Sequence, residues 1–127
     1  MNIEIKSIPH EEHRYETIGD WYNVIKAVDP NQEKVLTIRV SEMENANYMF
    51  LIALHELVEA WLCQSRGISQ TQVDSFDFNS KDEEPGDSSL APYHREHEFA
   101  TIVERMMAHE MGIEWGEYEH YLTEVTD

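Results

Sequence analysis

The sequence has 127 residues, of which 41% are hydrophobic, and this is enough apolar material for one packed domain over residues 1–127. The 26 Asp and Glu residues outnumber the 9 Lys and Arg residues and give a formal net charge of −17, which would repel a phosphate backbone and argues against direct nucleic-acid binding. The single cysteine, Cys63, excludes an internal disulfide and a zinc site made of several cysteines.

The N-terminus carries no basic segment followed by an apolar stretch, so we expect no signal peptide. The longest apolar run, residues 48–54, is too short to cross a membrane. We therefore expect a cytoplasmic protein that does not bind membranes.

Strands are expected in the first third of the chain. Residues 2–6 alternate as in a short strand, and residues 34–40 are β-branched and alternating, which makes them the clearest strand in the sequence. Between them, residues 19–22 mark a turn into an aromatic stretch, and residues 29–31 mark a second turn.

Helices are expected in the rest of the chain. The first can begin at Ser41, Asn45 or Asn47 and runs to Arg66, where Gly67 supplies the stop. The remaining expected elements are a short helix from Ser69 toward Asp77, a loop over 82–89, a long helix over 92–112 beginning near Pro92, and an amphipathic segment over 115–125. The pattern predicts an α+β fold in which a small sheet or hairpin packs on a buried central helix and a second long helix.

The central helix carries three ionisable side chains in an apolar setting. Residues 47–63 are apolar in nearly every direction, which predicts a helix buried on all sides. His55 and Glu59 are four residues apart and share one face, while Glu56 lies about 100° around the helix. A buried carboxylate needs a compensating partner, and a divalent cation bound by His55 and Glu59 supplies one. The alternatives are a metal-free His–Glu pair in the core and a glutamate that faces solvent.

A third metal ligand is expected in the second long helix. Its predicted apolar face consists of Phe99, Ala100, Val103, Met106 and Met107. His97 lies at the edge of this face, so we predict His97 as the third ligand, with His94 as second choice. Glu96 and Asp77 remain open as further candidates. The hydroxyl of Tyr93 could stabilise a developing oxyanion, although a cap on the helix is the simpler role for it.

Several blocks of the sequence resemble a group of small uncharacterised proteins encoded by bacteriophages and prophages. The most specific are the H-E-L-V-E-A block at 55–60 and the Y-H-R-E-H block at 93–97, and the likeness covers about residues 19–118. It implies a phage origin and a shared site built from these blocks, without implying a reaction.

The strand at 35–40 followed by the His55 helix also resembles the core of the zincin metallopeptidases. That resemblance implies that His55 is a zinc ligand and Glu56 the general base of the H-E-x-x-H motif. Glu59 stands where the family has its second histidine, and an added carboxylate weakens the activation of a zinc-bound water. A remoter similarity is to the HD-type phosphohydrolases, whose acid is aspartate.

We therefore expect a small metal-binding, zincin-like phage protein. The metal is predicted to be zinc (Zn²⁺), and the protein to be a possible hydrolase or peptidase in which Glu56 activates water. The partner would be an unknown protein or peptide in the host cytoplasm. The alternative is an acidic interaction protein that inhibits a host DNA-binding or defence protein. Its support is the charge, because residues 74–127 hold fifteen acids and three bases.

Overall fold

The computed structural model describes residues 1–25, 34–80 and 84–126. The predicted turn at 29–31 and residues 82–83 of the predicted loop lie outside these residues. The elements in chain order are β1 (Asn2–Ile8), η1 (His10–Glu12), β2 (Gly19–Ile25), β3 (Lys34–Ser41), α1 (Ala46–Ser65), α2 (Gln70–Asn79), η2 (Pro85–Asp87), α3 (His94–Glu110) and α4 (Trp115–Thr126). The predicted α+β class is confirmed.

The sheet has the strand order β1-β3-β2, with β1 parallel and β2 antiparallel to β3. Alternate residues of β3, among them Leu36 and Ile38, are fully buried in the hydrophobic core. β2 was missed, because its residues predicted only a turn into an aromatic stretch. The polar residues Asp20 and Asn23 interrupt its apolar pattern, and pairing with β3, with Trp21 opposite Ile38, holds this segment extended.

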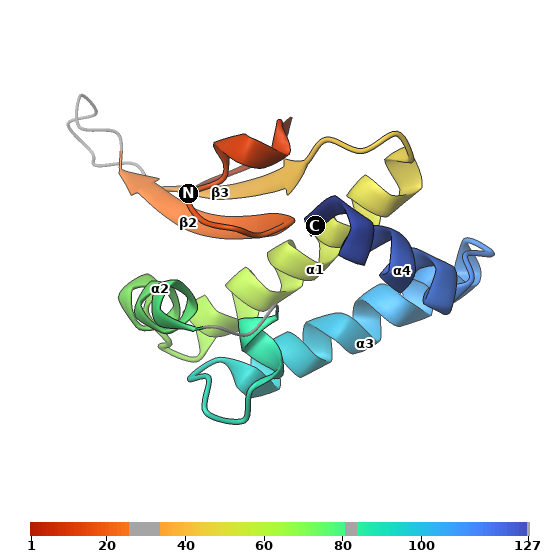
Figure 1. Ribbon diagram of the computed structural model, residues 1–127. Helices are drawn as coiled ribbons and strands as arrows, with labels where there is room; N and C mark the ends of the chain where they lie inside the picture. Colours follow the sequence, from red (N-terminus) through yellow and green to blue (C-terminus); the bar gives the residue numbers. More distant parts are fainter. Residues whose placement is uncertain (26–33, 81–83, 127) are drawn as a thin grey trace.

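Helix α1 lies between the sheet and α3 (Figure 1). Of the three predicted start points Asn45 is correct, because its side chain accepts hydrogen bonds from the first free backbone N–H groups of the helix. The prediction that α1 is buried on all sides is wrong. Phe50 and Trp61 are 47% and 49% exposed, because the sheet and α3 cover only part of the helix surface.

Helix α3 begins at His94, two residues after Pro92, and Gly112 with φ 71° follows its end. Its buried face differs from the predicted apolar face, because Phe99 and Met106 are 50% and 65% exposed. Of the predicted face Ala100 is buried, and the other buried residues of α3 are Glu96, His97, Glu104 and Ala108. Ala100 and Ala108 are small and allow α3 to approach α1 closely. The polar side chains of His97 and Glu104 on the same face then lie between the two helices.

No helix within the described ranges is both long enough and apolar enough to cross a membrane.

Candidate metal centre

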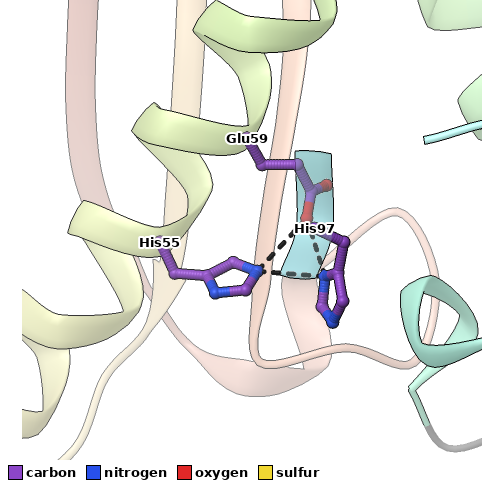
Figure 2. A group of neighbouring side chains, drawn as sticks. All are labelled: His55, Glu59 and His97. Carbon is purple, nitrogen blue, oxygen red and sulfur yellow. Dashed lines mark hydrogen bonds and ion pairs between the residues drawn. The ribbon is translucent and has the colours of Figure 1, made fainter. Parts of the chain in front are cut away.

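Three side chains from two helices meet at one point. His55 and Glu59 extend from α1 and His97 extends from α3, and all three point toward one another (Figure 2). The Nε2 atom of His55 lies 3.1 Å from Nδ1 of His97 and 3.2 Å from Oε2 of Glu59. The third side of this triangle, from His97 Nδ1 to Glu59 Oε2, is 2.8 Å. All three residues are buried, with exposed fractions of 8%, 5% and 3% for His55, Glu59 and His97. This group could hold a metal ion.

A carboxylate stands behind each imidazole ring. Nδ1 of His55 lies 2.8 Å from Oε1 of Glu104, and Nε2 of His97 lies 3.1 Å from Oδ1 of Asp87. In the neutral form that binds a metal, each outer ring nitrogen would carry the proton and donate it to the carboxylate behind it, because an ionised carboxylate can only accept a hydrogen bond. The inner nitrogens of the neutral rings then hold lone pairs. Metal-binding histidines have this arrangement, in which the second ring nitrogen donates to a carboxylate.

Without a metal, a proton on an inner ring nitrogen can be donated to Glu59, in keeping with the raised pKa of both histidines, and a metal ion would take the place of such protons. With the outer nitrogens protonated, the triad has two nitrogen lone pairs and one carboxylate oxygen at mutual distances of 2.8–3.2 Å. Tetrahedral zinc with bonds of 2.0–2.1 Å sets neighbouring ligand atoms about 3.3 Å apart. The triangle is therefore close to one face of a zinc tetrahedron.

The electrostatics of the triad favour positive charge. Burial opposes the charged form of His55, but hydrogen bonds with Glu104 and Glu59 raise the pKa of His55 well above its ordinary value. Burial also opposes charge on His97, and contact with Glu59 raises the pKa of this ring. Burial by itself would raise the pKa of Glu59, yet hydrogen bonds with His55 and His97 lower it to about 2. Glu59 is thus ionised under ordinary conditions, and the negative potential attracts protons or a cation.

Two further contacts fix the ligand side chains. The indole Nε1 of Trp21, on β2, donates a hydrogen bond of 3.1 Å to Oε1 of Glu59. This leaves Oε2 as the oxygen directed at the histidines. The hydroxyl of Tyr118, on α4, donates a hydrogen bond of 2.6 Å to Oε2 of Glu104. The sheet and the last helix therefore both help to hold the ligands in place.

The triad borders a pocket of about 380 Å³, whose lining includes His55, His97, Glu104 and Glu56. Glu56 is partly buried and lies against β2, since a Cβ atom on Gly19 would approach its Oε1 to 2.8 Å. Burial and then the charge of Glu59 raise the pKa of Glu56 well above its ordinary value. A carboxyl group of this kind, beside a candidate metal site and facing a pocket, is suited to proton transfer.

The structure brings together the two α1 residues and the preferred third candidate, His97, and it separates the other candidates from them. Nδ1 of His94 lies 2.9 Å from the carbonyl oxygen of Gly86, and its Nε2 lies 3.2 Å from Glu98. Glu96 is buried but accepts a hydrogen bond of 2.7 Å from Arg66.

Asp77 and Tyr93 form a separate group beside the triad. The hydroxyls of Tyr15 and Tyr93 both donate hydrogen bonds to Asp77, and burial raises the pKa of this carboxyl to about 6. The hydroxyl proton of Tyr93, considered as an oxyanion stabiliser, is therefore directed at Asp77.

The outer partners of the triad were not found by sequence reasoning. Glu104 lies seven residues after His97 on the same helical face, and this spacing was its only signal. Trp21 and Tyr118 come from β2 and α4, and no local pattern connects them to the H-E-x-x-E motif. Gly86 was also missed as a site residue, although a side chain there would overlap the ring of His97.

A scan against protein-family models and searches of curated proteins and solved structures find no match for this chain.

Proposed function

We propose that this protein is a zinc-dependent, zincin-like hydrolase. In this function His55, Glu59 and His97 hold the metal and Glu56 is the general base. The observation that carries it is the triangle of ligand atoms with sides of 2.8–3.2 Å, backed by a carboxylate at each outer imidazole nitrogen. Both inner ring nitrogens and one oxygen of Glu59 converge on a point that a metal ion could fill.

The donor set favours zinc over calcium and magnesium. Calcium and magnesium prefer oxygen ligands, whereas two imidazole nitrogens with one carboxylate oxygen suit zinc. Zinc sites of the structural kind are closed by four protein ligands, whereas catalytic sites keep three and leave a position for water or substrate. Three ligands beside a pocket of about 380 Å³ correspond to the catalytic kind.

The charge of the donor set also bears on catalysis. The sequence suggested that Glu59, in place of a second histidine, would weaken water activation. With His97 as third ligand the set contains two histidines and one carboxylate, the same composition as in known zinc peptidases. The helix supplies one histidine and the carboxylate, and the later helix supplies the second histidine. The order of the three ligands along the chain therefore differs from that in the zinc peptidases, while the total charge of the ligands is the same.

Glu56 has the position and the chemistry of a general base. It follows His55 directly on α1, lines the same pocket and is not one of the three ligands. When bound, zinc would lower the pKa of a water molecule and polarise a carbonyl group. The Glu56 carboxylate would take the proton of that water and later deliver it to the leaving group. The reaction class is hydrolysis of an amide or ester.

The first experiment measures metal in protein purified without chelators and without a nickel column. We expect about one zinc per chain, and loss of zinc in His55→Ala and His97→Ala. His94→Ala is the matched control, because it removes a neighbouring histidine of the same block and should keep the metal. Absence of zinc together with no uptake of added zinc would refute the metal site.

The second experiment separates catalysis from a structural metal. Zinc-loaded wild-type protein is tested against a library of internally quenched peptides and simple esters. Glu56→Gln should keep its zinc and lose hydrolysis by at least about a hundredfold, because the proton acceptor is gone. If wild-type protein and Glu56→Gln are equally inactive while both hold zinc, the metal only fastens α1 to α3 and the hydrolase function is wrong.

A further inference from the structure

The pocket beside the triad has a strongly one-sided charge. Five carboxylates line it: Glu56, Glu84, Asp87, Glu104 and Glu119. They come from four parts of the chain, namely α1, the segment around η2, α3 and α4. In the described residues, neither lysine nor arginine lines this pocket. The charge therefore belongs to the pocket as a whole, and no single run of acidic residues produces it.

Some of these carboxylates already have hydrogen-bond partners in the protein. Glu104 accepts hydrogen bonds from His55 and Tyr118, and Asp87 accepts one from His97. Others have no such partner: within the part of the chain that the structure describes, the side chains of Glu56 and Glu119 form no ion pair. The side chain of Glu84 is 61% exposed, and its Oε1 lies 3.8 Å from Nε2 of His97.

A divalent ion in the triad would offset carboxylate charge near His55 and His97, but the histidines of the pocket add no positive charge of their own. Three histidines line the pocket, but His55 and His97 must be neutral to bind a metal through their inner nitrogens. The third, His120, is exposed and pairs with Glu124 on the same helix. Glu119 on α4 and Glu84 before η2 thus remain available to a cationic group that enters from solvent.

We propose that the pocket takes a cationic substrate, namely a peptide or ester that carries a lysine ammonium or an arginine guanidinium group close to the reacting carbonyl. Glu119 and Glu84 are the residues that select it. This inference rests on the proposed function, because it takes the pocket beside the triad as the place where the substrate binds. An acidic substrate would be repelled by Glu119 and Glu84 and would bind more weakly.

The test uses the full chain with Glu56→Gln, loaded with zinc, so that binding is measured without turnover. The probes are three labelled alanine-based peptides that differ only in two central residues: two lysines, two glutamines or two glutamates. Fluorescence anisotropy should give tightest binding for the lysine peptide and weakest for the glutamate peptide. Adding Glu119→Gln or Glu84→Gln should weaken lysine-peptide binding about two- to fivefold each, the range for a partly exposed ion pair. Higher salt should reduce the preference.

The matched control addresses the net charge of −17, which attracts any cation. Glu117→Gln changes the net charge as much as Glu119→Gln does and lies on the same helix, but Glu117 does not line the pocket. We expect Glu117→Gln to leave lysine-peptide binding unchanged. Equal losses in the two variants, or equal binding of the three peptides, would overturn the inference.

The cationic substrate class and the hydrolase function can be refuted independently of each other. If zinc-loaded wild-type protein cleaves neutral or acidic peptides as well as basic ones, the cationic substrate class is wrong and the hydrolase function stands. If the lysine peptide binds selectively and loses affinity in Glu119→Gln, yet the wild type cleaves no basic peptide or ester, the pocket recognises cations and the hydrolase function is wrong.

Discussion

Replacing Glu104 by glutamine tests whether the triad is a metal site, without touching any of its three ligands. Glu104 is 5% exposed and accepts two hydrogen bonds, 2.8 Å from Nδ1 of His55 and 2.6 Å from the hydroxyl of Tyr118. A glutamine side chain has one acceptor oxygen and one NH₂ group, so it can accept from one of these donors while its NH₂ group opposes the other. The substitution also removes the negative charge that makes His55 a better ligand.

The expected effect follows from these two losses. Removing a carboxylate behind a metal-binding histidine costs about 10- to 100-fold in metal affinity, which corresponds to about 1.4–2.7 kcal/mol. Leaving a buried donor unpaired costs about 1–3 kcal/mol of folding stability, so the variant should also melt at a lower temperature. If His55, Glu59, His97 and Glu104 formed only a polar network in the core, Glu104→Gln would lose the same folding stability, but the protein would bind no zinc whose affinity could change.

The assay is a competition titration in which a fluorescent zinc chelator competes with the protein, after circular dichroism has shown that each variant is folded. Tyr118→Phe removes one donor but keeps the charge on Glu104, so it should lose less affinity than Glu104→Gln. Glu110→Gln, at an exposed position of the same helix, should bind zinc as the wild type does. A folded Glu104→Gln variant with wild-type zinc affinity would show that the contact between Glu104 and His55 has no part in metal binding.

Three further predictions concern the same site. Zinc at about a hundred times its Kd should stabilise the fold by about 2.7 kcal/mol and raise the Tm by roughly 10 °C, and a chelator should reverse this; an unchanged melting curve would contradict it. Zinc affinity should fall as the pH falls, because contacts with Glu104 and Glu59 raise the pKa of His55, contact with Glu59 raises the pKa of His97, and protons then compete with the metal. Calorimetry at several pH values measures this, and equal affinity throughout would count against histidine ligands. Gly86→Ala should abolish zinc binding, since its Cβ atom would overlap the ring of His97, whereas Gly67→Ala, at a glycine with open space around it but φ 73°, should cost stability and keep the metal.

The sequence by itself determined what depends on short-range geometry. A helical repeat of 3.6 residues places His55 and Glu59 on one face wherever the helix lies, and the burial of ionisable groups then requires a partner. The caps at Asn45 and Ser69 and the stop at Gly67 were readable for the same reason, because each satisfies backbone groups within a few residues. The α+β class followed from the strand patterns before residue 41 and the helical patterns after it.

Only the tertiary structure decided how α3 is rotated about its axis. The predicted inward face included Ala100, which is buried, but also Phe99 and Met106, which are exposed. The buried polar residues His97 and Glu104 lie beside Ala100 in their place. The face of a helix that packs on its neighbours is the face whose shape fits them. Here two small alanines permit a close approach of α3 to α1, and the candidate ligands fill the space between the two helices. His97 therefore meets Glu59, while His94 is directed at the carbonyl of Gly86.

The groups behind the ligands also came from the tertiary structure. Trp21 belongs to a strand that exists because it pairs with β3, and Tyr118 belongs to the last helix of the chain. Residues 14 to 49 positions apart in the sequence can be in contact at any spacing. A single sequence therefore shows no repeating pattern from which such contacts could be predicted. The sequence could therefore propose His55, Glu59 and His97 as ligands. The packing of the elements brought these three side chains together and placed Glu104 and Asp87 behind the two rings.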